Sequence, residues 1–294
     1  MQTVDVTNPE SDPTIDQGAD TLLGRVFVDQ GIIDEDDIEI IVKHARQKRL
    51  RFGEAARELK LISKEDLERA MAKQFNNPFL AEGEGGYPVE LVAAFKPFSK
   101  KGQAIHKLRA CLLQHWNSVE HRSLAVVGSS THQGCSYIAA NLAITFSQLG
   151  QRTLLVDADM QNAHLHQLFN INNNVGLSAV LAGRTSINFV AKKLPFFRNL
   201  SIVSAGAPPP NATELLGRKE LNNVMMKLRK HFEIVIFDTP PLDSNSGAEL
   251  IARACGDSIV VLRKDFTIIE DAKVLVDALR ENKSDIIGAV MTNY

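Results

Sequence analysis

The stretch from Ser123 to Gly150 constrains the fold more than any other part of the chain. An apolar run of strand type breaks at Gly128, and a helical pattern of apolar residues begins near Ser136 and stops at Gly150. A strand, a glycine-containing loop and a helix in this order are typical of a phosphate-binding loop. In that motif, backbone N–H groups at a helix N-terminus face a phosphate, and a hydroxyl serves Mg²⁺. We interpret Gly128 and Gly134 as the two glycines of the motif and Ser136 as its hydroxyl.

One residue departs from this motif. Cys135 stands where a phosphate-binding loop has lysine. Loss of one preorganised donor to a developing charge typically costs about 10² to 10³ in rate, so we expect nucleotide binding to outlast phosphoryl transfer. At a helix N-terminus, the thiol is also expected to have a lowered pKa. Arg263 and Lys264 follow a later strand and are candidates for a replacement cation, with solvated charges at a strand end as the alternative.

Strand-like and helical runs alternate from Ser123 onward, which predicts an α/β fold with a mainly parallel sheet and helices on both faces. The strands are expected at residues 124–127, 153–156, 200–203, 234–237, 258–262 and 286–291. Ligands of such sheets bind beyond the carboxyl ends of the strands.

Three aspartates fall at such strand ends. Asp157 and Asp159 follow one strand, and Asp238 ends another. Carboxylates placed there can hold Mg²⁺ or orient an attacking group. A single aspartate would be read as a turn residue at a strand end, but the three together with the loop favour a nucleotide site.

Residues 1–100 differ from the rest of the chain in composition and in sequence pattern. Residues 1–20 contain five acidic and no basic residues, which predicts a disordered acidic lead. Residues 21–80 contain a repeat with an offset of 29 residues (Gly24 to Gly53, 53 − 24), and each half is followed by a helix-capping pattern. We therefore expect a helical tandem-repeat domain, a linker over residues 81–100, and the phosphate-loop domain over residues 101–294.

Composition excludes several classes of protein. With 33 basic and 35 acidic residues, the net charge is −2, so nucleic acid is not an expected partner. Three cysteines without paired spacing argue against a disulfide framework or a zinc site. No apolar run approaches the roughly 18 residues of a membrane span, and the N-terminus has no signal pattern. A cytoplasmic location is expected.

Several motifs give a resemblance to a known family. Besides the loop at 128–136, they are LLVDADM at 154–160, GLSAVLAG at 176–183, AGAPPPNATELL at 205–216 and VIFDTPP at 235–241. From Phe98 to Tyr294 the chain resembles bacterial tyrosine kinases of exopolysaccharide export, in the MinD/ParA-like P-loop group. The nearest likeness is the subfamily that accompanies chain-length determinants.

The resemblance implies ATP or ADP with Mg²⁺ as ligands. It assigns the Mg²⁺-ligand role to Ser136, the catalytic acidic role to Asp157, and metal-site roles to Asp159 and Asp238, with Cys135 at the lysine position. The implied nucleotide contacts are Gly128, Ser129, Ser130, Thr131, His132, Gln133, Gly134, Cys135, Ser136, Tyr137 and Asn293.

The same resemblance implies a partner and an assembly. The partner would be the cytoplasmic part of a membrane polysaccharide chain-length determinant, which would hold the protein at the periphery of the inner membrane. Family members build rings through an acidic-x-x-Arg-x-x-Arg helix, and the aligned residues here are Gln103, His106 and Arg109. Of the three, only Arg109 keeps the residue of the motif, so ring formation is left open and a homo-oligomer is one option.

The repeat at the front resembles the N-terminal domain of type II secretion and pilus ATPases. In some members of that family the module binds cyclic di-GMP, and the matching positions here are Leu23, Gly24, Arg51, Phe52 and Gly53. Lys60 replaces the second glycine of the second half. A helical docking domain is the alternative interpretation.

Three functions are compatible with these patterns. The favoured one is a nucleotide-binding, kinase-like regulator of polysaccharide export with weakened catalysis. The second is an active, autophosphorylating tyrosine kinase, and the third is a MinD- or ParA-type positioning ATPase.

Overall fold

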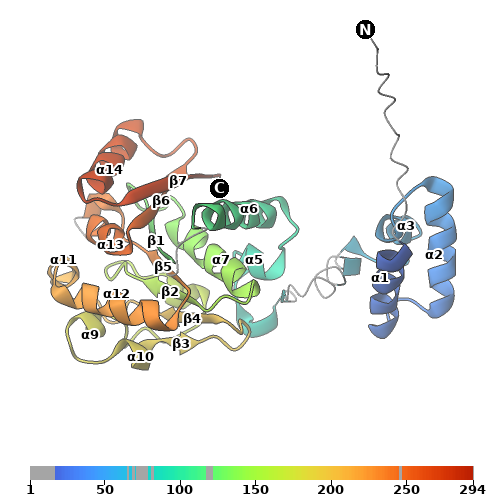
Figure 1. Ribbon diagram of the computed structural model, residues 1–294, viewed down its shortest axis with the longest axis horizontal. Coiled ribbons are helices and arrows are strands. Elements are labelled where there is room, and N and C mark those ends of the chain that lie inside the picture. Colours follow the sequence, from blue (N-terminus) through green and yellow to red (C-terminus); the bar gives the residue numbers. More distant parts are fainter. Residues whose placement is uncertain are drawn as a thin grey trace, which may run out of the picture. The chain divides into compact units, whose positions relative to one another are not determined.

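The computed structural model describes residues 17–64, 66–67, 70, 79–80, 83–116, 122–244 and 247–293. The chain divides into two compact units, Met1–Pro78 and Phe79–Tyr294 (Figure 1). Of the predicted acidic lead, residues 1–16 lie outside the described residues. Residues 17–20 form the first turn of helix α1 and are not part of a disordered lead, since α1 spans Gln17–Asp29.

The first unit begins with three helices, α1 (Gln17–Asp29), α2 (Glu35–Lys48) and α3 (Phe52–Glu58). The predicted caps are present. The N–H of Asp34 donates to Asp37 Oδ2 at 3.0 Å, and the N–H of Ser63 donates to Asp66 Oδ2 at 3.0 Å. Each bond satisfies a backbone donor near a helix start, where no intrahelical partner exists.

The core of this unit follows the 29-residue repeat. Four pairs of buried side chains are related by the offset: Leu23 and Phe52, Phe27 and Ala56, Ile33 and Ile62, and Ile41 and Ala70. Equivalent positions of the two halves therefore pack into one shared core. Neither half has enough apolar surface to be stable alone, so the duplication in sequence corresponds to a duplication in structure.

The turns after α1 and α3 have the same hydrogen bonds. Gly31 N–H donates to Val28 O at 2.9 Å, and Lys60 N–H donates to Arg57 O at 3.0 Å. Gly31 has φ +65° and Lys60 has φ +59°. The turn requires a left-handed residue in both halves, which a glycine adopts freely and a lysine adopts at a cost.

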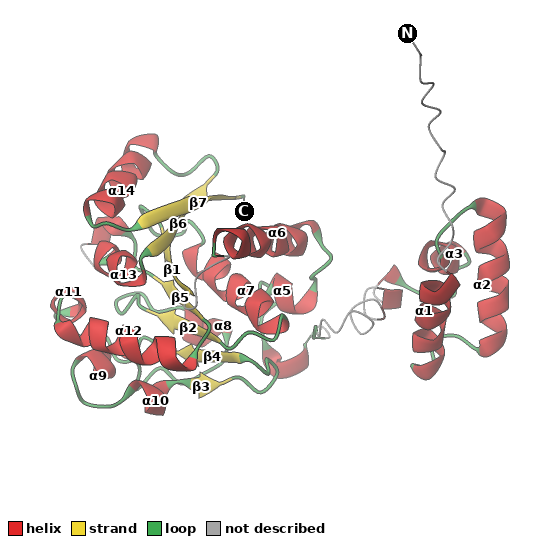
Figure 2. Ribbon diagram, viewed as in Figure 1, coloured by secondary structure: helices red, strands yellow, loops and turns green. Residues whose placement is uncertain are grey.

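The second unit contains one seven-stranded sheet with the order β3-β4-β2-β5-β1-β6-β7 (Figures 1 and 2). The strands are β1 (Arg122–Val127), β2 (Thr153–Asp157), β3 (Lys192–Lys193), β4 (Leu200–Val203), β5 (Ile234–Asp238), β6 (Asp257–Arg263) and β7 (Asp285–Thr292). Every pairing is parallel except β3 with β4. The six predicted strands are all present, whereas β3 was not predicted.

Helices cover both faces of this sheet. They are α5 (Val92–Phe95), α6 (Lys100–His115), α7 (Cys135–Gln148), α8 (Leu165–Leu168), α9 (Leu177–Leu181), α10 (Ile187–Val190), α11 (Ala212–Leu216), α12 (Lys219–His231), α13 (Ala248–Cys255) and α14 (Ile269–Glu281), with short 3₁₀ turns at Glu84–Gly86 and Leu242–Ser244. Alternate residues of β1 enter the two cores: Leu124 and Val126 face α6 and α7, while Ala125 and Val127 face α12 and α13.

The segment predicted to be a linker is instead part of the second unit. Tyr87, Leu91 and Phe95 are buried in the core beside α7. Asn141 of α7, which is fully buried, accepts the N–H of Ala93 at 2.9 Å and donates to Glu90 O at 3.1 Å. Glycine and proline content suggested flexibility, but the few large apolar side chains within the segment anchor it to the domain.

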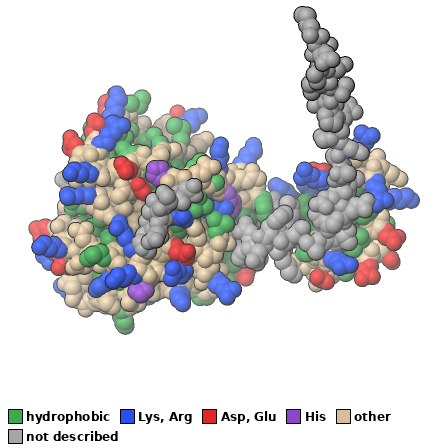
Figure 3. Space-filling model, viewed as in Figure 1, with side chains coloured by type: hydrophobic (Ala, Val, Ile, Leu, Met, Phe, Trp, Pro, Cys, Tyr) green, Lys and Arg blue, Asp and Glu red, His purple; other side chains and the backbone are tan. Residues whose placement is uncertain are grey.

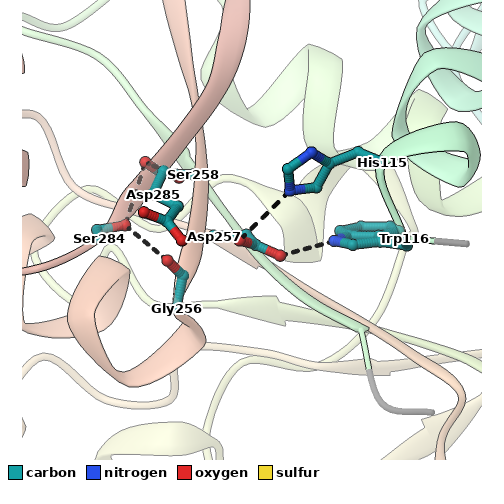
Figure 4. Close-up of polar contacts among 7 residues, drawn as sticks. All are labelled: His115, Trp116, Gly256, Asp257, Ser258, Ser284 and Asp285. Atoms are coloured by element: carbon teal, nitrogen blue, oxygen red, sulfur yellow. Dashed lines mark hydrogen bonds and ion pairs between the residues drawn. The ribbon is translucent and has the colours of Figure 1, made fainter. Parts of the chain in front are cut away.

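Helix α6 is joined to the start of β6 by a polar cluster (Figure 4). Trp116 is fully buried and its Nε1 donates to Asp257 Oδ2 at 2.6 Å. His115 Nε2 lies 4.0 Å from the other oxygen of Asp257. Ser258 and Ser284 contact each other beside this carboxylate, with 3.2 Å between their hydroxyls. This end of the sheet is opposite the carboxyl ends of the strands.

On the face drawn in Figure 3, Lys and Arg side chains are interspersed with Asp and Glu on both units, in keeping with the net charge of −2. Among the described residues, no helix combines the length and the apolar composition needed to span a bilayer.

Candidate functional site

The loop between β1 and α7 forms the centre of the candidate site. Gly134 caps α7 with φ +96°, so the first N–H groups of the helix have no intrahelical partner and point out of its N-terminus. The predicted assignment of the first glycine of the motif is wrong. Gly128 and Gly134 are six positions apart (134 − 128), and the motif has five, so the first glycine of the motif falls on Ser129.

Gly128 is nevertheless required by the loop. A Cβ at this position would lie 2.6 Å from Gln133 Oε1 and 2.8 Å from Cys135 Sγ. The Gln133 side chain is 1% exposed and closes the loop on itself, because its Oε1 accepts the N–H of Ser129 at 2.9 Å and its Nε2 donates to Ser129 Oγ at 2.9 Å. No sequence pattern indicated this role for Gln133.

The ends of β6 and β7 hold the loop from outside. Arg263 Nη1 donates to His132 O at 3.0 Å, and Thr292 Oγ1 donates to Gln133 O at 2.8 Å. In a trans peptide, the C=O and the N–H point in opposite directions. Because both carbonyls face the strand ends, the N–H groups of Gln133 and Gly134 are turned the other way, an arrangement that suits an anion.

Asp157 and Asp238 lie side by side behind the loop. They are paired residues at the ends of the neighbouring strands β2 and β5, and both side chains are buried. Asp157 Oδ2 accepts the N–H groups of His164 and Leu165 at 3.2 and 3.1 Å. Asp238 accepts a hydrogen bond from the Ser136 hydroxyl. The Oδ1 atoms of both aspartates are buried without a hydrogen-bond partner among the described residues.

Burial of these two carboxylates disfavours their charged forms. Desolvation, with a smaller contribution from nearby Asp159, raises the pKa of Asp157 from 3.8 to about 7. Desolvation, together with the charge of Asp157, raises the pKa of Asp238 well above its ordinary value. Two adjacent carboxyl groups that resist ionisation and have unpaired oxygens are suited to a cation, which would remove both penalties.

Asp159 lies nearer to solvent on the same side of the sheet. Its Oδ1 accepts the N–H groups of Gln161 and Asn162 at 3.2 and 2.9 Å, while partial burial raises its pKa. Gln161 donates to Pro209 O at 3.1 Å, so this side chain bridges two loops at the edge of the site.

The described residues contain no cluster of three His, Cys, Asp or Glu side chains able to hold a metal by themselves. Mg²⁺ does not require one, because it keeps several waters and binds through one or two protein groups plus substrate phosphates. Ser136 and the unpaired oxygens of Asp157 and Asp238 fit that mode of binding.

The thiol at the lysine position is neutral. Desolvation and the neighbouring Asp238 raise the pKa of Cys135 well above its ordinary value, so the expectation of a lowered pKa is wrong. The helix N-terminus favours a thiolate, but burial and adjacent carboxylates outweigh it. Cys135 therefore brings neither a positive nor a negative charge to the loop.

A cavity of about 540 Å³ opens in front of the loop. Its wall includes the predicted residues Ser130, Thr131, His132, Gln133, Gly134, Cys135, Ser136, Tyr137 and Asp159. Gly128, Ser129, Asp157, Asp238 and Asn293 are not on the wall; Gly128 and Ser129 shape the loop, and the two aspartates lie behind it.

Sequence reasoning missed part of this wall. Glu90 and Leu91 come from the segment expected to be a linker, and Asn141 and His164 come from α7 and the turn before α8. Arg263, at the end of β6, also lies on the wall and was a candidate from the sequence. A signal existed for Asn141, since it interrupts the apolar run from Ile138 to Ile144 in α7.

The predicted dinucleotide residues of the first unit occupy its interior. Leu23, Gly24, Phe52 and Gly53 are buried, and Arg51 alone is exposed. A Cβ on Gly24 would lie 3.2 Å from Phe52, and one on Gly53 would lie 2.5 Å from Leu67. Both glycines therefore permit close helix packing, which accounts for them without a ligand.

Comparisons with known proteins agree with this geometry. The family model described as "AAA domain" matches residues 130–281. The tyrosine-protein kinase YwqD of Bacillus subtilis (strain 168) is 32% identical over 170 residues, which is 58% of this chain and 71% of YwqD. The tyrosine-protein kinase etk of Escherichia coli (strain K12) is 28% identical over 203 residues, which is 69% of this chain but only 28% of that longer protein.

A comparison with solved structures also finds a tyrosine kinase domain. The kinase domain of E. coli ETK is similar with a TM-score of 0.66 and 28% identity, covering 69% of this chain and 79% of that one. MinD of Pyrococcus horikoshii, solved with Mg-ADP, shares the fold with a TM-score of 0.50 and 22% identity, covering 58% of this chain and 70% of that one. The AAA match begins at residue 130 and does not include the first unit, whose resemblance to secretion ATPases stays a prediction. The chain belongs to the AAA domain family and, within it, to the bacterial tyrosine-protein kinases.

Proposed function

We propose that this chain is a nucleotide-binding member of the bacterial tyrosine kinases whose phosphoryl transfer is weakened by Cys135. The observation that carries the proposal is the position of a neutral thiol at the N-terminus of α7, directly in front of two buried carboxyl groups with unpaired oxygens. The loop N–H groups would bind the phosphates of ATP or ADP, and Ser136, Asp157 and Asp238 would hold Mg²⁺.

The residues of the site support nucleotide binding more fully than phosphoryl transfer. Magnesium, when bound, supplies charge stabilisation at the phosphates. Asp157 holds the position to which the resemblance assigns the catalytic acidic role, and a cation bound beside it would favour its ionised form. The missing positive charge is the weak point, since phosphoryl transfer depends almost entirely on positioning and on electrostatic stabilisation.

Purified protein incubated with Mg²⁺ and labelled ATP tests this proposal, beside the variant Cys135→Lys. We expect wild type to bind nucleotide but to transfer phosphate at least about tenfold more slowly than the variant. Equal transfer rates would favour the second candidate, an active autophosphorylating kinase. Failure of both proteins to bind nucleotide would refute the assignment of the site.

The proposed cellular role is inferred from the resemblance to the tyrosine kinases of exopolysaccharide export. We propose that the protein acts in exopolysaccharide biosynthesis, in the cytoplasm, beside the cytoplasmic part of a membrane chain-length determinant that it regulates. Purification of the determinant's cytoplasmic segment with this chain, with and without ATP, tests the association. A positioning ATPase of the MinD or ParA type is the third candidate and would be favoured by ATP hydrolysis without tyrosine labelling.

Cyclic di-GMP binding by the first unit stays an untested prediction. The burial of Leu23, Gly24, Phe52 and Gly53 favours the docking-domain interpretation. Calorimetry of the full chain with cyclic di-GMP decides between them, since an absence of heat at high micromolar ligand would leave docking as the role of this unit.

A further inference from the structure

We propose that Arg263 supplies positive charge to the cavity wall for nucleotide binding, in place of the lysine that the loop lacks. This inference rests on the proposed nucleotide binding and names the residue that makes it possible. Arg263 is the last residue of β6, and β6 is paired with β1, the strand that leads into the loop. The fold therefore brings residue 263 next to residues 128–136, although more than a hundred residues separate them.

The electrostatics of the cavity require a cation. Glu90 and Asp159 lie on its wall, and Asp157 and Asp238 lie behind the loop. Of the described residues on the wall, Arg263 is the only Lys or Arg. Apart from Arg263, the protein offers a polyphosphate acidic side chains, two histidines, uncharged side chains and the loop N–H groups.

The side chain of Arg263 is held in place. Its Nη1 donates to His132 O at 3.0 Å, and its guanidinium lies over the Phe266 ring, 4.7 Å from the centroid. Its backbone N–H donates to Thr267 Oγ1 at 2.7 Å, and Thr267 Oγ1 also accepts from Gln133 Nε2 at 2.9 Å. The arginine and the loop are thus parts of one hydrogen-bonded unit, so little conformational entropy is lost when a phosphate arrives.

Lys264, the other candidate from the sequence, does not share this position. It is exposed and is not among the residues of the cavity wall. A guanidinium also matches the geometry of phosphate oxygens better than an ammonium does, because it can donate two parallel hydrogen bonds.

Nucleotide titration by calorimetry tests this inference, using the full chain with Mg²⁺ and adenosine, ADP and ATP. We expect Arg263→Gln to weaken ADP and ATP binding by at least about tenfold, since a charge-assisted hydrogen bond typically supplies that much. Adenosine binding should be unchanged. Arg263→Lys should recover part of the loss, and Arg253→Gln, which changes an exposed arginine on α13, should bind as wild type does.

A second variant distinguishes an effect of the charge of Arg263 from an effect on the shape of the loop. If Arg263 acts by charge, Cys135→Lys should restore ADP binding in the Arg263→Gln background, because it returns a cation to the loop. If Arg263 only shapes the loop through His132, the added lysine would not restore binding, and the inference would be wrong. ADP binding that is the same in wild type and Arg263→Gln would overturn the inference alone, whereas no ADP binding by wild type would overturn the proposed function and the inference with it.

Discussion

The buried carboxyl pair makes the stability of the ligand-free protein depend on pH. Burial raises the pKa of Asp157 from 3.8 to about 7, so between these two values the folded state keeps a proton that the unfolded state has released. Stability must then fall as pH rises through this window, by at most about 1.4 kcal/mol per pH unit. Over roughly three pH units, this titration lowers the stability of the folded protein by up to about 4 kcal/mol.

Asp157→Asn removes this titration. An amide oxygen can still accept the N–H groups of His164 and Leu165, although less strongly than a carboxylate, at a cost of about 1 kcal/mol. We therefore expect the variant to be more stable than wild type by about 3 kcal/mol at pH 8 and to show a flatter pH dependence between pH 4 and 7. Because Asp157→Asn removes the carboxyl group beside Asp238, it should also lower the pKa of Asp238.

Urea unfolding at several pH values, with a metal chelator and without nucleotide, measures the effect. Asp271→Asn, at an exposed position on α14, is the matched control and should keep the slope of wild type. A slope in Asp157→Asn that equals the slope of wild type between pH 4 and 7 would refute the reasoning, because the titration would then belong to other groups.

Three further changes test particular contacts. Lys60→Gly should stabilise the first unit by about 1 kcal/mol in urea unfolding because φ is +59° there, whereas Gly31→Ala at the equivalent turn should destabilise it by a similar amount. A destabilising Lys60→Gly or a stabilising Gly31→Ala would contradict the strain argument. Asn141→Ala should cost about 2 to 4 kcal/mol and expose the segment before α6 to proteolysis, and unchanged proteolysis would show that this side chain is not the anchor. Trp116→Phe should cost about 1 to 3 kcal/mol in thermal unfolding by leaving Asp257 without its indole donor, and a neutral effect would mean that water replaces the bond.

Most of the fold could be predicted from local patterns. The strands around Leu124, Leu154 and Val235 are continuous apolar runs, which only a sheet covered on both faces can bury. The repeat at an offset of 29 predicted a shared helical core in the same way. The segment before α6 was misjudged because glycine and proline dominate its composition, whereas its packing depends on Tyr87 and Leu91, which are few but deeply buried.

The sequence by itself determined that strand, loop and helix meet at Gly134, that aspartates end two strands, and that the loop lacks its lysine, because these features depend on neighbours along the chain. Only the tertiary structure decided the charge state of Cys135 and the position of Arg263. A pKa depends on burial and on carboxylates from other strands, and the distance from residue 263 to the loop depends on the order of strands in the sheet. Neither quantity is local, so the pattern of nearby residues named Arg263 only as one of two candidates and gave the wrong direction for the pKa of Cys135.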